Sequence, residues 1–149
     1  MTSSFLPAKL DTMWLLIDAP AVLEVVGAVP WLRLPRAQRA VPGVVAWRAQ
    51  AVPVVDLSAF IPGAAAGEAR ARTLIVRVGQ STIALPVDAV TEVVHVPPEA
   101  MRIPHAVQSE IAAGETDVQG HLMALIDLDA LVRRLAGEEG SVRSDDERL

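Results

Sequence analysis

Short runs of valine, isoleucine and leucine, separated by turn-forming residues, dominate this 149-residue chain. Branched aliphatic residues favour strands, whereas glycine and proline interrupt them. The chain holds 11 prolines and 9 glycines, and only 3% of its residues are aromatic, so its core has to be aliphatic. The predicted strands cover residues 14–17, 23–29, 43–47, 51–56, 73–78, 82–87, 90–96 and 122–127. This pattern predicts an all-β fold, with 73–78 and 82–87 forming a hairpin.

Helical signals are confined to two segments. Residues 106–113 are weakly amphipathic. Residues 127–135 carry a stronger signal, because Asp127 can cap the first turn and the aliphatic residues that follow form one stripe. We therefore expect a short helix close to the C-terminus.

Two segments of the chain recur in the same order and at nearly the same spacing. Residues 21–26 (AVLEVV) recur as 89–94 (AVTEVV), and 54–60 (VVDLSAF) recur as 125–131 (LIDLDAL). Chance similarity among valine-rich strands is the alternative to duplication. A duplicated unit of this size buries little surface alone, so the two units are expected to share a core. The stretch near 62–70, rich in alanine and glycine, is then the linker between two similar halves.

The formal charge of −5 argues against nucleic acid or an anionic membrane as the main partner. Residues 137–149 hold five acidic residues against two arginines, and we expect them to form a disordered tail behind a domain at 1–136. The apolar run 13–17 is too short for a signal peptide or a membrane span. The sequence thus predicts a cytoplasmic protein that does not insert into a membrane.

No constellation of catalytic or ligand residues can be assembled from the sequence. The chain has no cysteine, which excludes thiolate chemistry and disulfides. Its histidines, His95, His105 and His121, are scattered and have no second ligand at helical spacing. We therefore expect a protein that is not an enzyme and has neither a metal nor a cofactor.

Charged residues inside or beside apolar runs are the candidate binding residues. Glu24 lies among aliphatic neighbours, and Arg48 follows a predicted strand. The stretch 31–39 combines Trp31 with three arginines, and these two residue types are enriched at interfaces. A solvent-facing position on a half-buried sheet is the alternative for Glu24 and Arg48, and an ordinary basic surface loop is the alternative for 31–39.

Four motifs in order resemble the CheW-like family, the coupling proteins of bacterial chemosensory systems. Residues 43–57 (GVVAWRAQAVPVVDL) resemble the central signature of that family. Residues 22–25 match an upstream element, and 83–93 and 122–131 fit its second half. The resemblance covers roughly residues 5–135.

The resemblance implies two small SH3-like β-barrels packed on a shared hydrophobic interface, with a short C-terminal helix and no catalytic activity. Its members link the cytoplasmic tip of a methyl-accepting chemoreceptor to the regulatory domain of a chemotaxis histidine kinase. By position in the motifs, Val22, Glu24 and Arg48 would contact the receptor in an apolar groove between the barrels. Gly43 and Val44 would contact the kinase.

Two departures from the family pattern bear on kinase binding. Ala49 stands where the family has a turn glycine, and Pro7 interrupts the first strand. Both are expected to fall in the barrel that contacts the kinase, which makes kinase binding doubtful. The alternatives are a full coupler, a variant that binds receptor but not kinase, and a sensor of small ligands or peptides built on the same barrels.

Overall fold

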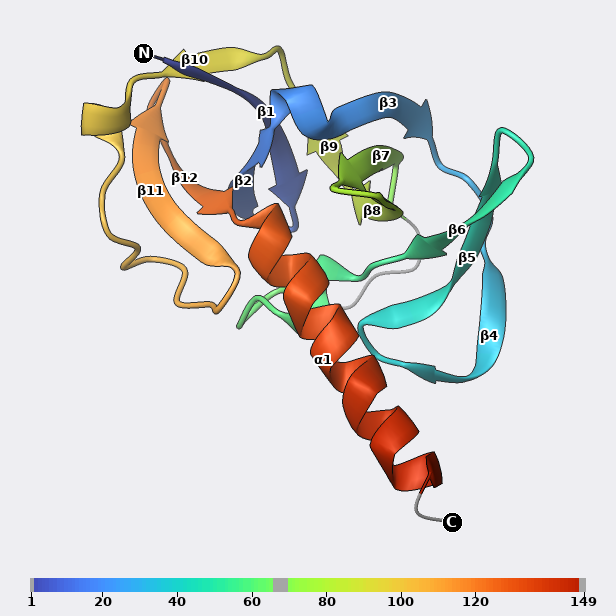
Figure 1. The fold of residues 1–149 in the computed structure, drawn as a ribbon. Coiled ribbons are helices and arrows are strands. Elements are labelled where there is room, and N and C mark those ends of the chain that lie inside the picture. The colour runs from blue at the N-terminus through green and yellow to red at the C-terminus, as the bar shows by residue number, and fades with distance from the viewer. Residues whose placement is uncertain (1, 66–69, 148–149) are drawn as a thin grey trace.

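Two six-stranded sheets and one helix make up the computed structural model, which describes residues 2–65 and 70–147 (Figure 1). The predicted all-β class is confirmed. The first sheet has the order β10 (Val94–Val96), β1 (Ser3–Leu10), β2 (Met13–Asp18), β12 (His121–Ile126), β11 (Ala112–Val118), and β9 (Ala89–Val90) also pairs with β1. The second has the order β3 (Val22–Gly27), β7 (Arg72–Val78), β8 (Ser81–Val87), β6 (Gln50–Val54), β5 (Val41–Trp47), β4 (Leu32–Gln38). Short 3-10 turns lie at η1 (Ala19–Ala21), η2 (Leu57–Ala59) and η3 (Pro98–Ala100), and helix α1 covers Leu128–Glu147.

Each sheet takes one hairpin from the other half of the sequence. The dark blue β1–β2 hairpin lies among the yellow and orange strands β9 to β12, and the β7–β8 hairpin lies among β3 to β6 (Figure 1). The stretch near 62–70 therefore does not separate two barrels, because β6 and β7 on its two sides belong to the same sheet. Its residues 66–69 lie outside the described residues.

The repeated sequence segments nevertheless occupy equivalent places. Strand β3 pairs antiparallel with β7, and β9, which begins the second copy of that motif, pairs antiparallel with β1. Strand β6 pairs in parallel with β8, and its counterpart β12 pairs in parallel with β2. The two halves are thus built alike and exchange their first hairpins.

Both exchanged hairpins are buried on their two faces. In β7, Leu74 and Val76 face the central core between the sheets. Ile75 faces a separate core that the curved second sheet encloses, which we call the interior of that sheet. In β2, Ile17 faces the same central core, whereas Leu16 faces the interior of the first sheet. Burial on both faces explains why these strands read as continuous apolar runs instead of alternating ones.

Pro7 is accommodated within the first sheet. It pairs with Leu16 of β2, and its carbonyl accepts a hydrogen bond from the Thr91 amide at 3.1 Å. The nitrogen and carbonyl of one strand residue point to the same side, so the missing donor faces residues 91–93. There the neighbouring strand is interrupted between β9 and β10. The proline therefore costs the sheet no ladder bond.

The β5–β6 turn holds two non-glycine residues in the left-handed region. Trp47 pairs with Gln50 across the turn, and the φ angles are 47° for Arg48 and 62° for Ala49. Two-residue hairpins favour a positive φ at both central positions. The turn type is thus ordinary, and Ala49 carries the strain that glycine would avoid.

Three local predictions differ from the structure. Residues 106–113 form no helix, because the Glu115 carboxylate accepts the His105 and Ala106 amides and Ser109 donates its hydroxyl to the Phe60 carbonyl. The single strand expected at 90–96 is two strands. The C-terminal helix continues beyond residue 135 to Glu147, a stretch without proline. The division into a body and a disordered tail stays a prediction.

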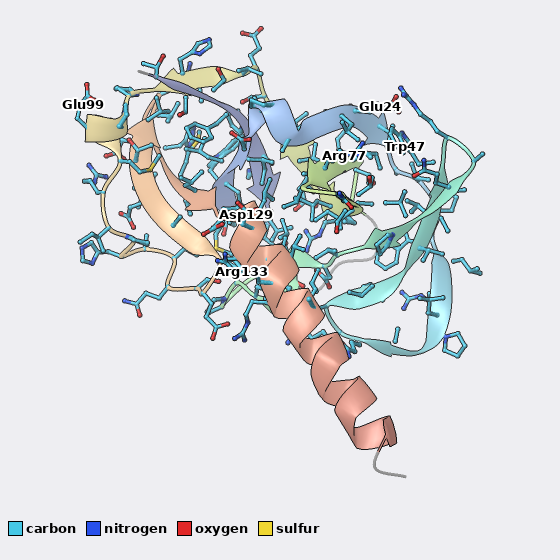
Figure 2. The ribbon with its side chains drawn as sticks, in the orientation of Figure 1. Glu24, Trp47, Arg77, Glu99, Asp129 and Arg133 are labelled. Atoms are coloured by element: carbon cyan, nitrogen blue, oxygen red, sulfur yellow. The ribbon has the colours of Figure 1, made fainter. Side chains whose placement is uncertain are left out.

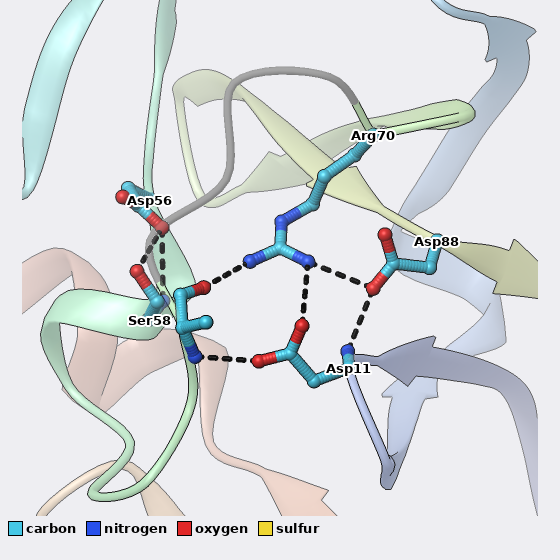
Figure 3. A network of polar contacts seen from close by, with 6 residues as sticks. Asp11, Asp56, Ser58, Arg70 and Asp88 are labelled. Carbon is cyan, nitrogen blue, oxygen red and sulfur yellow. Dashed lines mark hydrogen bonds and ion pairs between the residues drawn. The ribbon is translucent and has the colours of Figure 1, made fainter.

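A buried arginine joins the ends of the two exchanged hairpins (Figure 3). Only 4% of the Arg70 side chain is exposed, and its guanidinium lies 2.7 Å from the Asp88 carboxylate after β8 and 3.6 Å from that of Asp11 in the β1–β2 turn. The same guanidinium donates to the Ala65 carbonyl, and the Asp11 amide donates to Asp88 at 2.6 Å. The network fixes the two hairpins relative to each other.

Removing the charge of Arg70 should destabilise the fold. In Arg70→Met the carboxylates of Asp11 and Asp88 lose their cation, and because both are about one-third exposed, we expect a loss of roughly 1–3 kcal/mol in unfolding free energy. Urea unfolding measures it. The control Arg102→Met breaks an exposed pair with Asp117 and should change stability by about 0.5 kcal/mol or less. Equal stability of the two variants would contradict a role for the network.

Replacing Ala49 by glycine should stabilise the protein. The positive φ of Ala49 strains an L-residue, so we expect Ala49→Gly to raise the unfolding free energy by about 1 kcal/mol. Ala51→Gly, on the exposed part of strand β6, is the matched control and should lower it by about 0.5–1 kcal/mol. Thermal unfolding of both variants tests the difference in sign.

Candidate functional site

Glu24, Trp47 and Arg48 form one polar cluster, which we call the β3 corner. Figure 2 shows Glu24 and Trp47 next to each other beside β3. The indole nitrogen of Trp47 donates to Oε2 of Glu24 at 3.1 Å, and Nη2 of Arg48 donates to Oε1 at 3.2 Å. The Arg48 guanidinium also lies over the Trp47 ring, 4.8 Å from its centre. The structure thus brings together two of the predicted receptor-contact residues.

The β3 corner closes the open side of the second sheet. Strand β3 is one edge of that sheet, and β5 lies next to its other edge. No ladder joins β3 to β5 among the described residues, so side chains have to make the connection. Trp47 does so, because its ring packs on the core around Val45 and Val52 while its nitrogen reaches Glu24.

Val22 has a different environment from the other two predicted receptor residues. It packs against the central core, and an irregularity in the pairing with β7 separates it from Glu24. The neighbours Leu23 and Val25 are more accessible, at 43% and 40% exposed. The accessible apolar surface of β3 is therefore supplied by Leu23 and Val25, which were not predicted as contact residues.

The predicted kinase-contact residues lie in the middle of β5, away from the turn. Gly43 has a structural role, since a Cβ at this position would lie 2.4 Å from the Leu32 carbonyl oxygen of the facing strand β4. Val44 pairs with Leu32, a residue that is 69% exposed at the sheet edge. The expectation that Pro7 and Ala49 share one barrel is wrong, because Pro7 lies in β1 and Ala49 in the β5–β6 turn of the other sheet.

A cleft of about 400 Å³ lies between the two sheets. Phe5 and Leu125 of the first sheet line it opposite Val78 of the second. Polar groups line it as well: Asp18, Arg77, Asp127 and Asp129. Partial burial raises the pKa of the Asp18 carboxyl, and the charge of Asp129 adds to that rise. The cleft between the sheets is thus mixed in polarity. Ala21 of η1 lines it, whereas the predicted receptor-contact residues Val22, Glu24 and Arg48 do not.

Two further ionisable residues, Glu115 and His95, have structural partners. The amides of His105 and Ala106 stabilise the charged form of Glu115 and lower its pKa, with smaller contributions from the charges of His105 and Arg102. His95 bonds to Ser4. In the part of the chain that the structure describes, no three acidic, histidine or cysteine residues gather as metal ligands would. The described helix α1 lacks the apolar length needed to cross a membrane.

The basic stretch 31–39 spans the connection to β4, the strand itself and the turn after it. The Arg33 guanidinium lies 5.7 Å from the centre of the Trp31 ring, and Arg39 donates to the Ser58 carbonyl at 3.5 Å. This stretch was expected as a loop or a binding patch, and most of it is an edge strand.

Comparison with known proteins agrees with this architecture. The sequence model of the CheW-like domain matches residues 4–136. The fold is similar to the crystal structure of the scaffolding protein TtCheW from Thermoanaerobacter tengcongensis, with a TM-score of 0.74, 22% identity, and coverage of 85% of this chain and 84% of that one. No curated protein matches the chain at a significant level. Because the family match covers both sheets and the start of α1, the chain belongs to the CheW-like family.

Proposed function

We propose that this CheW-like chain is a non-catalytic coupling adaptor that links chemoreceptor tips to a chemotaxis histidine kinase in the cytoplasm. The observation that carries the proposal is the family match over residues 4–136, which includes every residue assigned to a partner. The receptor would contact the β3 corner with the adjacent Leu23 and Val25. The kinase would contact the outer side of β5 around Val44.

The β3 corner has the properties of a protein-binding site. Arg48 is held by Glu24 and Trp47 although 68% of its side chain is exposed, so it is accessible and already oriented. The exposed aliphatic residues of β3, Leu23 and Val25, flank Glu24 in the chain. Arginine is enriched at interfaces, and an arginine that is already oriented suits a partner contact.

The structure offers no reason to expect weakened kinase binding. Pro7 costs no ladder bond, and Ala49 keeps the turn geometry at the expense of local strain. Strand β5 remains paired with both β4 and β6. Among the alternatives, we therefore favour the full coupler over a variant that binds receptor alone.

Reversing the charge of Arg48 should weaken receptor binding and leave the fold intact. In Arg48→Glu the new carboxylate faces Glu24, so we expect affinity for a receptor-tip hairpin fragment to fall by about tenfold or more. The matched control is Arg102→Glu, which also breaks an exposed ion pair but lies on the first sheet. Calorimetric titration gives the affinities. An equal loss in both variants would show that the effect is not specific to the β3 corner.

A second substitution should separate the two partners. Val44 lies on the outer side of β5, so Val44→Glu places a charge at the proposed kinase contact without entering the core around Val45. We expect about tenfold weaker binding to the kinase regulatory domain and unchanged receptor binding, the reverse of Arg48→Glu. If wild-type protein binds the receptor fragment but not the kinase domain, the receptor-only variant is the correct assignment.

A further inference from the structure

We infer that Trp47 is a positioning residue, whose indole holds Glu24 and Arg48 in the one arrangement that a partner contacts. The inference rests on the proposed receptor binding, since it adds a residue to that same site. Trp47 stands inside the motif at 43–57, but the family resemblance gives it no role.

The two oxygens of Glu24 are held by two different donors. Oε2 accepts from the Trp47 indole and Oε1 from the Arg48 guanidinium, while the guanidinium stacks on the indole ring. Each of the three side chains therefore touches the other two. Loss of the indole nitrogen releases one carboxylate oxygen, and loss of the ring also removes the surface on which Arg48 rests.

Trp47 is the fixed member of this triangle. Its ring packs against the interior of the second sheet, whereas Arg48 lies on a turn and is mostly exposed. A free arginine side chain samples many rotamers, and a partner that binds it has to remove this freedom. An indole anchored in the core reduces that cost before the partner arrives.

The alternative is that Trp47 only fills the core. Trp31 offers a matched comparison, because it packs against the same cluster and also lies under an arginine guanidinium. Among the described residues, however, no carboxylate accepts a hydrogen bond from the Trp31 indole. A pure packing role predicts similar consequences for Trp47→Phe and Trp31→Phe.

The first test needs no partner. NMR relaxation of the Arg48 Nε–H group reports its motion in wild type, Trp47→Phe and Trp31→Phe, each verified as folded by thermal unfolding. We expect the Arg48 group to be ordered in wild type and in Trp31→Phe and mobile in Trp47→Phe, which keeps a ring but removes the donor. Unchanged Arg48 motion in Trp47→Phe would overturn the inference.

The second test measures affinity for a receptor-tip hairpin fragment. We expect Trp47→Phe to weaken binding by about three- to tenfold and Trp31→Phe by about twofold at most. Adding Glu24→Gln to Trp47→Phe should cause less than the sum of the two separate losses, because both act through Arg48. Strictly additive losses would contradict positioning. Wild-type protein that fails to bind the fragment overturns the proposed function, and the relaxation experiment then decides the role of Trp47 alone.

Discussion

Burial of two hairpins on both of their faces is the constraint on which this fold depends. Strands β1–β2 and β7–β8 each supply one face to the central core and the other to the interior of a sheet. Neither hairpin can leave its place without exposing two apolar surfaces. The buried Arg70, held between Asp11 and Asp88, then fixes the ends of the two hairpins relative to each other. The position of the β3 corner follows from this frame, because β3 forms its ladder with β7 at the edge of the second sheet.

Strands that are buried on both faces were predicted best from the sequence. Strands such as β7 and β8 read as continuous apolar runs because they are covered on both sides. Strands β4 and β11 were not predicted, because polar residues and a proline interrupt their apolar pattern. These are Arg33 and Pro35 in β4, and Glu115 and Asp117 in β11. The helix expected at 106–113 failed because hydrogen bonds to residues distant in the chain determine that backbone. Exchange of hairpins could not be read from the repeat, since a repeat reports similarity and not pairing.

The candidate site was predicted in part. Motif resemblance selected Glu24 and Arg48, and the structure places them 3.2 Å apart. Trp47 was missed because nothing in the local sequence indicates that an indole will cross the open side of a sheet to reach another strand. A signal was present in hindsight, since a tryptophan beside a turn has one hydrogen-bond donor that needs a partner. Gly43 was selected for partner contact, and its immediate role is to let β4 approach.

The exchanged topology also has a consequence for biosynthesis. During translation the β1–β2 hairpin emerges first, yet its parallel neighbour β12 is among the last strands to be made. The second sheet can assemble once β8 has left the ribosome, whereas the N-terminal hairpin waits with its face around Phe5 and Leu16 uncovered. Pairings between such distant parts of a chain form slowly. The nascent protein therefore passes through a half-built state in which its earliest segment is the one most in need of protection from aggregation.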